Sequence, residues 1–419
     1  MNNINKQIIS MAKDCKAASK ITAQLATQIK NDVLNNMADA LLDHAKTIVS
    51  ENSKDLEKAK SNGLSSSMID RLIISHARLT KMAAAIREIA QLPDPVGEVT
   101  KTWRRPNGLE VSQKRIPLGV IGMIYESRPN VTSDAAALCF KAGNAVFLRG
   151  GSEAFHSNQA IADALHSALK QNGLCKEIIT LIPTPDRKAV QEMLTLSDYI
   201  DIIIPRGGEG LIKYVSENSR IPVIKHFKGV CHQYVDASAS IETAVNLLVD
   251  GKTSRPGVCN ALETLLVHKD IANEFLPAAQ KAMTLHGVEL RGCSETRRIL
   301  TDIKKATQDD YYAEFLSLVL AVRVVDSMDD AIDHISTYGS DHTEVIVTNN
   351  YSNAKEFHRR VNSSVVLVNA SSRFSDGGEL GLGAEIGIST TKLHAYGPMG
   401  LDSLTTQKFI VNGDGQIRH

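Results

Sequence analysis

The chain has 419 residues, nearly three times a domain of about 150 residues, so we expect two or three domains or one large α/β unit with an appendage. Hydrophobic residues make up 43% and charged residues 22%, which is typical of globular domains and excludes a disordered chain or a small cross-linked scaffold. Because 47 Lys and Arg balance 47 Asp and Glu, and aromatic residues are only 5%, neither nucleic acid nor an anionic membrane is an expected partner.

The first part of the chain predicts helices only. From residue 4 to about residue 92, apolar residues recur at spacings of three and four, which is the helical period. Pro93 and Pro95 end this stretch because prolines withhold backbone donors and restrict the residues before them. Residues 101–116 follow as an expected β-hairpin, with an Asn-Gly pair between two partly alternating runs.

Short apolar runs then alternate with helical stretches in two successive sets. The expected strands are residues 120–125, 145–148, 178–182, 200–204, 263–268, 320–325, 344–348 and 364–368. The expected helices are residues 134–141, 152–171, 186–194, 209–217, 270–285, 327–337 and 351–360. This alternation predicts parallel βαβ units in two doubly wound α/β domains, and in such sheets ligands lie at the carboxyl ends of strands.

Two glycine-rich turns follow expected strands and precede expected helices, where backbone N–H groups can bind an anion. They are Arg149-Gly150-Gly151 and Gly207-Gly208. Arg149 suits phosphate because its guanidinium binds in a bidentate way, although a surface arginine is the alternative. Neither turn is a strict GxGxxG motif and no P-loop motif occurs, so a P-loop kinase or ATPase is disfavoured. A tight turn is the simpler alternative for each glycine pair.

The cysteines indicate a reduced chain with one candidate nucleophile. They lie at positions 15, 139, 175, 231, 259 and 293, without a Cys-x-x-Cys pair or zinc-finger spacing, so we expect a cytoplasmic protein and no metal site. Cys259 follows a Pro-Gly bend before the strand 263–268, where a substrate can reach it, and Arg255 favours its thiolate. Burial in the core is the usual role of a cysteine and is expected for Cys139.

No targeting or membrane segment is expected. The amino terminus has no apolar centre of the kind found in signal peptides. No run reaches the ~18 apolar residues that a membrane-spanning helix needs.

Five motifs occur in order along the chain. They are YESRPNVT at 125–132, KAGNAVFLRGGSE at 141–153, RPGVCNALETLLVH at 255–268, GLGAE at 381–385 and GPMGLDSLTT at 397–406. Together they resemble the gamma-glutamyl phosphate reductases, or glutamate-5-semialdehyde dehydrogenases, of the aldehyde dehydrogenase superfamily, and the resemblance runs essentially end to end.

The resemblance implies a domain organisation. It implies a cofactor-binding domain from residues 1–100 and 117–228, and a catalytic domain from residues 229–395. The hairpin 101–116 and the tail 396–419 would form an oligomerisation element, so a homo-oligomer is expected.

The resemblance also implies roles for single residues. The nucleophile falls on Cys259, and the cofactor site on Arg149, Gly150, Gly207, Gly208 and Glu314. Where this chain has Arg149, the superfamily usually has lysine. Glu314 resembles the glutamate that holds the nicotinamide ribose, and a surface carboxylate at a helix end is the alternative.

Further residues are expected around the reacting carbonyl. Hydrolytic aldehyde dehydrogenases place a glutamate base in a Glu-Leu-Gly-Gly turn, whereas residues 226–229 read His-Phe-Lys-Gly, which suits a reductive enzyme that must exclude water. His226 is a candidate general acid or phosphate contact, or an incidental histidine. Asn130, with the backbone N–H of Cys259, is the candidate oxyanion donor. Arg128 and Arg255 are expected to bind the substrate phosphate or carboxylate.

The implied reaction is the NADPH-dependent reduction of L-glutamyl 5-phosphate to L-glutamate 5-semialdehyde and phosphate, through a Cys259 thioester, in proline biosynthesis. A functional link to a glutamate 5-kinase would supply the substrate. The first alternative is an oxidising or coenzyme-A-acylating aldehyde dehydrogenase, which would share the nucleophile but use water or a thiol. The second is a non-catalytic binding protein with the same fold.

Overall fold

The computed structural model describes residues 3–225 and 227–418, and these residues form two compact units. Unit 1 comprises Met1–Lys225, Leu382–Gly387 and Met399–His419, and unit 2 comprises His226–Gly381 and Ile388–Pro398. The expected boundary at residue 228 lies close to this division. The candidate His226 lies outside the described residues.

Unit 1 begins with the helical stretch that the apolar spacing predicts. Its helices are α1 (Asn3–Thr22), α2 (Thr27–Asp43), α3 (Ala45–Ser61), α4 (Ser66–Leu72) and α5 (His76–Gln91). Helix α2 shows why they form, because its buried residues Val33, Met37 and Leu41 recur on one face. The chain leaves the helical stretch at Pro93, as expected.

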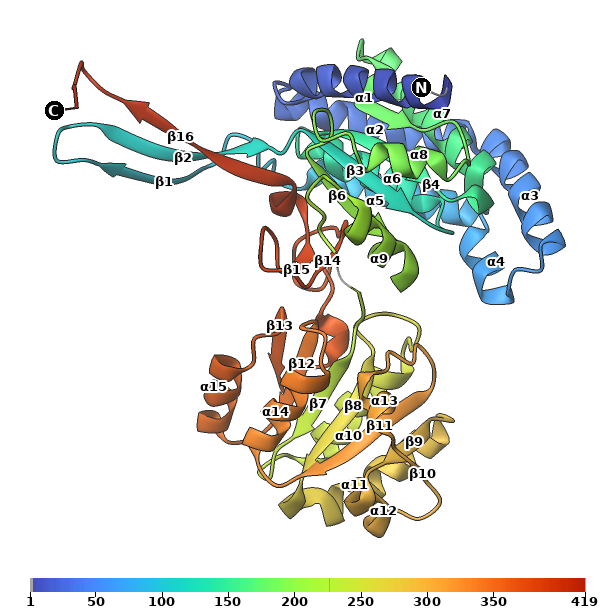
Figure 1. Cartoon of the computed structure of the whole chain (residues 1–419), viewed down its shortest axis with the longest axis vertical. Helices are drawn as coiled ribbons and strands as arrows, with labels where there is room; N and C mark the ends of the chain where they lie inside the picture. The colour runs from blue at the N-terminus through green and yellow to red at the C-terminus, as the bar shows by residue number, and fades with distance from the viewer. Residues whose placement is uncertain (1–2, 226, 419) are drawn as a thin grey trace. The chain divides into compact units, whose positions relative to one another are not determined.

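A four-stranded parallel sheet forms the centre of unit 1, in the order β5-β4-β3-β6. Its strands are β3 (Val120–Tyr125), β4 (Ala145–Gly150), β5 (Ile179–Leu181) and β6 (Ile202–Arg206). The helices between them are α6 (Asn130–Lys141), α7 (Phe155–Gln171), α8 (Lys188–Met193) and α9 (Glu209–Asn218). Ile8 and Ala12 of α1 pack with Val120, Phe147 and Met193 in one buried cluster, which joins α1 and α8 to the sheet (Figure 1).

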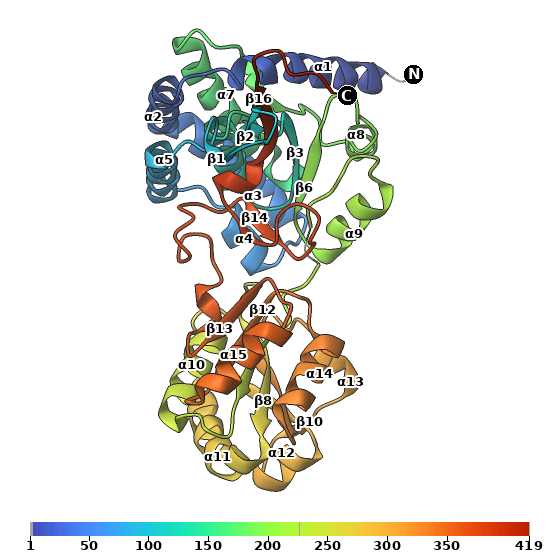
Figure 2. The same ribbon diagram turned by 90° about the vertical axis from the view of Figure 1, so that its left-hand side faces the viewer.

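Three antiparallel strands make an arm on unit 1. They are β1 (Val99–Arg104), β2 (Glu110–Pro117) and β16 (Thr405–Asn412), in the order β1-β2-β16. Gly108 has φ +89° in the expected hairpin turn, a conformation that favours glycine. The arm extends as a ribbon from the rest of unit 1 (Figure 1) and is seen end-on in Figure 2, and most of the β1 and β16 side chains are exposed.

Unit 2 contains a seven-stranded parallel sheet with the order β10-β9-β11-β8-β7-β12-β13. Its strands are β7 (Cys231–Val235), β8 (Leu262–His268), β9 (Glu289–Gly292), β10 (Lys304–Lys305), β11 (Val319–Val325), β12 (Thr343–Val347) and β13 (Val365–Val368). Its helices are α10 (Ile241–Thr253), α11 (Lys269–Leu285), α12 (Ser294–Ile299), α13 (Gln308–Tyr312), α14 (Met328–Tyr338) and α15 (Tyr351–Arg360).

Two buried clusters hold the helices of unit 2 to its sheet. One joins α10 and α11 to the sheet through residues such as Leu248, Phe275 and Leu265. The other joins α14 and α15 to it through Ile332, Phe357 and Leu266. Leu265 and Leu266 are neighbours in β8, so their side chains point to opposite faces and the helices cover both faces of the sheet. This is the doubly wound α/β arrangement that the alternation predicts.

The remaining elements are short, and some differ from the sequence-based expectation. Strands β14 (Gly387–Ser389) and β15 (Gly397–Met399) pair with each other. Strands β9 and β10 were not expected, because Glu289, Arg291 and the two lysines of β10 give no apolar run. Helix α6 begins at Asn130 rather than near residue 134. No helix within the described ranges is long and apolar enough to cross a membrane.

Candidate active site

Cys259 lies in a turn at the edge of the unit 2 sheet where its parallel strands begin. The turn, residues 254–261, leads from α10 into β8, and Cys259 is partly exposed in it. The loops that precede β7, β11 and β12 end at the same edge, because all these strands are parallel and begin there. Cys259 thus lies in the Pro-Gly bend before its strand, where the sequence places it, and not at a carboxyl end, where ligands of doubly wound sheets are generally expected.

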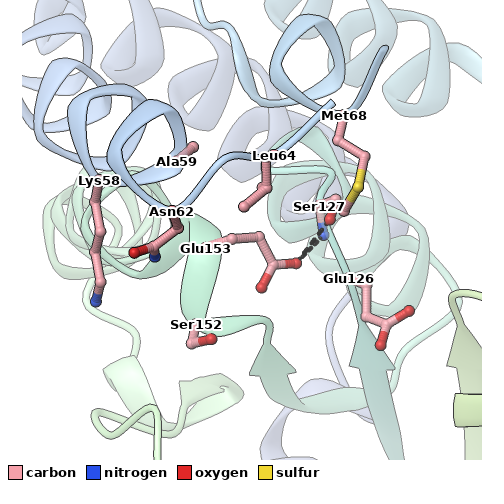
Figure 3. A pocket seen from close by; sticks show the side chains of 9 residues that line it. All are labelled: Lys58, Ala59, Asn62, Leu64, Met68, Glu126, Ser127, Ser152 and Glu153. Carbon is pink, nitrogen blue, oxygen red and sulfur yellow. Dashed lines mark hydrogen bonds between the residues drawn. The ribbon is translucent and has the colours of Figure 1, made fainter. Parts of the chain in front are cut away.

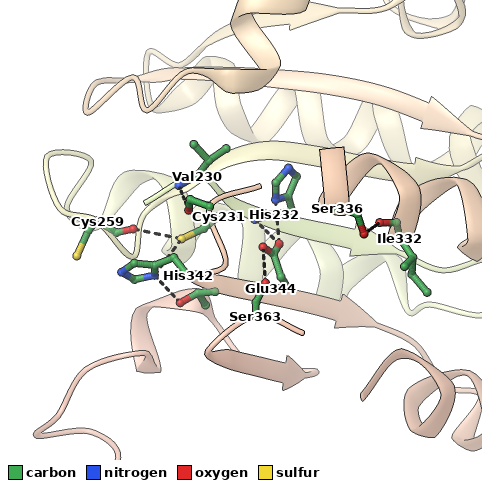
Figure 4. Close-up of polar contacts among 11 residues, drawn as sticks. Val230, Cys231, His232, Cys259, Ile332, Ser336, His342, Glu344 and Ser363 are labelled. Atoms are coloured by element: carbon green, nitrogen blue, oxygen red, sulfur yellow. Dashed lines mark hydrogen bonds and ion pairs between the residues drawn. The ribbon is translucent and has the colours of Figure 1, made fainter. Parts of the chain in front are cut away.

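The backbone of the Cys259 turn packs directly against the start of β7. A Cβ added to Gly229 would lie 1.9 Å from the carbonyl oxygen and 2.8 Å from the Cα of Cys259, so only glycine fits there. The Cys231 thiol donates to the same carbonyl oxygen at 3.2 Å (Figure 4). Burial raises the pKa of Cys231 well above its usual range, and this thiol therefore serves as a hydrogen-bond donor and not as a nucleophile.

Glu314 approaches the same place from the loop before β11. It follows α13, is partly buried, and its Oε1 accepts the Gly229 N–H at 2.9 Å. The structure thus brings Glu314 and Cys259 together through Gly229, within one unit. Glu314 is partly exposed beyond the end of α13, and its role toward the nicotinamide ribose stays a prediction.

Asn260 anchors the Cys259 turn on its other side. Its Nδ2 donates to the carbonyl oxygens of Arg373 and Ser375, and its own carbonyl oxygen accepts from the hydroxyl of Ser372 at 2.7 Å. Asn260 is buried, so these hydrogen bonds are shielded from water and hold the residue that follows the thiol.

A buried ion pair lies at the base of the turn. Lys252, in the last turn of α10, is 2.6 Å from Glu263, in β8, and neither side chain is exposed to solvent. The other carboxylate oxygen of Glu263 accepts the Leu316 N–H at 3.2 Å. Burial raises the pKa of Glu263 to about 7, and Lys252 opposes that rise.

A second buried polar cluster lies beside Cys231 in Figure 4. His232 donates from both its backbone N–H and its ring to the Glu344 carboxylate, which also accepts from Ser363. His342 lies 3.6 Å from the Cys231 sulfur. These groups tie the start of β7 to the starts of β12 and β13, which fixes the strand that supports the turn.

The remaining candidates for substrate contacts are placed as follows. Arg255 is exposed in the Cys259 turn. Arg128 and Asn130 belong to unit 1 and are exposed at the start of α6. The side-chain amide of Asn130 donates to Asp134 at 2.8 Å, and burial raises the pKa of Asp134 to about 6. An oxyanion role for Asn130 stays a prediction.

The cofactor candidates of unit 1 lie where strands β4 and β6 end. Arg149 is 8% exposed, donates to the Pro185 carbonyl oxygen, and has an Nε with no acceptor in the described part of the chain. Burial lowers the pKa of this guanidinium, so a further anion would stabilise it. Gly150 is required by packing, since a Cβ there would lie 2.1 Å from the amide nitrogen of Asn158.

The second glycine turn is already engaged by a carboxylate. The Gly208 N–H donates to Glu126 at 3.0 Å, and a Cβ on Gly207 would lie 2.4 Å from the same carboxylate oxygen. A phosphate at this N–H would have to displace Glu126. The role of Gly207 and Gly208 in cofactor binding stays a prediction.

A cavity opens at the same edge of unit 1 (Figure 3). Its volume is about 320 Å³, at the lower end of small-ligand pockets, and it is lined by residues of α3 and by those that follow β3 and β4. The Glu153 carboxylate lies at this cavity and accepts both the N–H and the hydroxyl of Ser127. Ser127 has φ +45°, an uncommon conformation for serine that these two bonds stabilise.

Several supporting residues were missed from the sequence. Glu263 stands in a strand with four apolar residues and no other carboxylate, and a carboxylate in such a buried strand was a usable signal. Gly229 and Cys231 gave no signal, because their contacts with Cys259 depend on which strands are neighbours in the sheet. No group of His, Cys, Asp and Glu in the described residues could hold a metal ion.

Comparisons with known proteins give one consistent result. The aldehyde dehydrogenase family model matches residues 2–290. The gamma-glutamyl phosphate reductase of Salinibacter ruber is 62% identical over 410 residues, which cover 98% of this chain and 94% of that protein.

Solved structures agree with this result. The crystal structure of the gamma-glutamyl phosphate reductase of Thermotoga maritima matches with a TM-score of 0.97 at 45% identity, over 98% of this chain and all of that one. An acetylating aldehyde dehydrogenase from Geobacillus thermoglucosidasius matches over the full length of both chains with a TM-score of 0.70 at 18% identity, which supports the shared fold alone.

Proposed function

The chain belongs to the aldehyde dehydrogenase family and, within it, to the gamma-glutamyl phosphate reductases, and on that premise we propose that Cys259 carries its reaction. The activity is the reduction of L-glutamyl 5-phosphate to L-glutamate 5-semialdehyde and phosphate, in proline biosynthesis. The observation that supports Cys259 is its partly exposed place in a turn that is fixed by contacts with Gly229 and Cys231 and by the hydrogen bonds of Asn260.

The acyl phosphate determines the first step. The Cys259 thiolate attacks the 5-carbonyl carbon and the C–O bond to phosphate breaks, which leaves a thioester and releases phosphate. The carbonyl oxygen carries negative charge during this attack, and the Cys259 N–H and the Asn130 amide are the proposed donors to it. Arg255 and Arg128 are the proposed partners of the phosphate or of the amino-acid carboxylate.

The family uses a nicotinamide cofactor, and we propose NADPH for this chain. The buried Arg149 Nε without an acceptor suits a phosphate of the cofactor, with Gly150 beside it, and the Glu153 carboxylate can accept from a hydroxyl group. When bound, the cofactor supplies the hydride that reduces the thioester carbon. Glu314 is the proposed holder of the nicotinamide ribose, and Gly207-Gly208 a proposed second cofactor contact.

Two proposals concern partners. We propose a homo-oligomer that pairs through the β1-β2-β16 arm, because its exposed strands can extend a sheet of another subunit. We also propose a functional link to a glutamate 5-kinase. The reaction consumes an acyl phosphate, which hydrolyses readily, and a kinase that acts on a carboxylate must supply it.

The test is the reverse reaction, oxidation of glutamate semialdehyde with NADP⁺. We expect the parent enzyme to require phosphate, and Cys259→Ser to lose the activity while it keeps NADPH binding near that of the parent. Cys175→Ser is the matched control, since it exchanges a partly exposed thiol outside this turn and should retain the activity. Full turnover by Cys259→Ser would remove this residue from the mechanism.

The same assay addresses the first alternative, because a coenzyme-A-acylating enzyme would require a thiol and no phosphate, and a hydrolytic one would require neither. For a non-catalytic binding protein, Cys259 would react with iodoacetamide as an ordinary cysteine and glutamate semialdehyde would give no protection.

A further inference from the structure

The buried pair Lys252–Glu263 connects to Glu314 through the loop before β11, and from Glu314 to Gly229 in the loop before β7. Both side chains have 0% exposure, and they lie on the two elements that flank the Cys259 turn, α10 and β8. The pair therefore closes the base of this turn. An ion pair without solvent contact has lost the hydration of both ions, so it is weak evidence for stability and needs another explanation.

The second oxygen of Glu263 suggests that explanation. It accepts the N–H of Leu316, which has φ +51°, a left-handed conformation that is unfavourable for a leucine. Leu316 is 46% exposed, so packing of its side chain does not account for this conformation. The hydrogen bond from the Leu316 N–H to Glu263 is a contact that stabilises this conformation.

Residues on either side of Leu316 continue the same connection. Phe315 lies against the pair, with the Lys252 ammonium 5.9 Å from the centroid of its ring. Glu314 reaches back to the Gly229 N–H, and Gly229 packs on the backbone of Cys259. The path from Glu263 through residues 314–316 thus returns to the turn from which it started.

We infer that Glu263 is a positioning residue that holds Leu316, and through it Glu314, in place against the Cys259 turn. Lys252 keeps the Glu263 carboxylate in place inside the unit. This inference rests on the proposed function of Glu314 and Cys259, because it is their separation that Glu263 fixes. What the loop needs from Glu263 is the acceptor for the Leu316 N–H, and not its charge.

Two double variants separate the acceptor from the charge. Lys252→Met with Glu263→Leu removes both, and replacement of a buried pair by apolar residues is often neutral for stability. Lys252→Gln with Glu263→Gln removes the charges but keeps an acceptor for the Leu316 N–H. Lys30→Met with Asp94→Leu is the matched control, because Asp94 also pairs with a buried lysine and accepts a backbone N–H, from Val96, in unit 1.

The first measurement is amide hydrogen exchange of the peptide that contains residues 313–318, without cofactor. We expect faster exchange in the Met/Leu variant than in the parent, and parent-like exchange in the Gln/Gln variant and in the unit 1 control. The second is kcat/KM for NADPH, expected to fall about 100-fold in the Met/Leu variant, as when a catalytic group is misplaced by about 1 Å, and to stay near the parent in the others.

Parent-like exchange and kcat/KM in the Met/Leu variant would overturn the inference, as would a Gln/Gln variant as impaired as Met/Leu. If the Met/Leu variant does not fold, Glu263→Asp decides, since it keeps the charge but is one methylene too short to reach Leu316, and it should show the same faster exchange. If the parent lacks phosphate-dependent oxidation, the proposed function fails, whereas the exchange result still tests Glu263.

Discussion

Gly229 shows how a residue without a side chain can determine where the nucleophile lies. Its missing Cβ lets the start of β7 approach the Cys259 carbonyl oxygen, and its N–H holds Glu314. Any other residue here must push the Cys259 turn away, and overpacking of this kind typically costs 1–3 kcal/mol of folding free energy. A displacement of about 1 Å costs roughly 100-fold in rate.

We therefore expect Gly229→Ala to lower kcat by about 100-fold and the free energy of unfolding by about 1–3 kcal/mol. Steady-state kinetics and urea unfolding measure the two effects. Gly210→Ala is the control, because a Cβ there meets no atom within 4 Å and alanine favours the helix α9. Normal kinetics of Gly229→Ala would show that the close approach is not needed for catalysis.

Arg149 permits a test of cofactor preference at the same scale. Among residues 3–225 and 227–418, the Nε of its buried guanidinium has no hydrogen-bond partner, and a lysine cannot replace this group because it lacks the planar guanidinium. We expect Arg149→Lys to raise KM for NADPH about tenfold, the effect of losing roughly 1.4 kcal/mol, and to change KM for NADH less. Arg220→Lys, on the exposed surface of unit 1, should change neither. Equal changes in KM for NADPH and NADH would show that Arg149 does not determine the preference for NADPH.

The site residues differ in how far the sequence predicts them. The Pro-Gly bend and the following strand predict the accessible turn of Cys259, since both are local properties of the chain. The contact of Cys231 with the Cys259 carbonyl oxygen is not local, because 28 residues separate the two and only strand order joins them. For the same reason, Glu263 and Leu316 give no sign of their hydrogen bond in the sequence.

At the scale of elements, apolar spacing predicts most strands and helices but not the order of the strands. The unit 2 order places β8 between β11 and β7, with β12 next to β7, so loops from four distant segments start at one edge. Periodicity has no information on which strands pair. This is why most elements were predicted within a few residues, whereas the loops that join Cys259 at its edge of the sheet were not.

Two glycines of the segment 377–383 have left-handed backbone conformations. Gly381 and Gly383 have φ +77° and +76°, and a Cβ on Gly383 would lie 2.1 Å from Leu92, whereas one on Gly381 meets nothing within 4 Å. Gly383 therefore serves the packing of its segment on the helical stretch. Both glycines adopt a conformation that costs other residues about 1–2 kcal/mol.

We expect Gly381→Ala to lower the free energy of unfolding by about 1–2 kcal/mol, and Gly383→Ala by about 1–3 kcal/mol more because of the contact with Leu92. Urea unfolding of the two variants measures the difference. KM for NADPH should stay unchanged in both. Equal stability of the two variants, or a higher KM for Gly383→Ala alone, would instead indicate that the segment faces a ligand.

At the scale of the whole molecule, the sequence predicts two α/β units because strands and helices alternate in two sets, and the resemblance places the boundary between them at residue 228. The alternation does not predict that the chain returns to unit 1 at residues 382–387 and again from residue 399, and only the resemblance groups the tail 396–419 with the hairpin 101–116. The return depends on β16, which pairs with β2 across nearly 300 residues of sequence, as the side-chain contact of Arg115 with Thr405, 290 residues apart, shows. Such a pairing leaves no local pattern.

The arm formed by this pairing carries apolar side chains that unit 1 does not cover. Phe409 is 62% exposed and Val411 is 55% exposed. The Phe409 ring lies edge-on to the Trp103 ring across the arm, with 6.2 Å between the ring centroids. Strands that expose apolar groups and an unpaired edge favour association with another chain. We therefore expect the arm to join subunits, with Phe409 near the centre of the contact.

Phe409→Asp should shift the oligomer toward the monomer, because a charge would have to be buried in an apolar contact. Light scattering coupled to size-exclusion chromatography measures the mass, and the shift should increase on dilution. Thr406→Asp adds the same charge to an exposed position of the same strand and is the control, which we expect to keep the parent mass. An unchanged mass for Phe409→Asp would place the subunit contact elsewhere, while a loss of β2–β16 pairing in hydrogen exchange would show that the substitution had unfolded the arm instead.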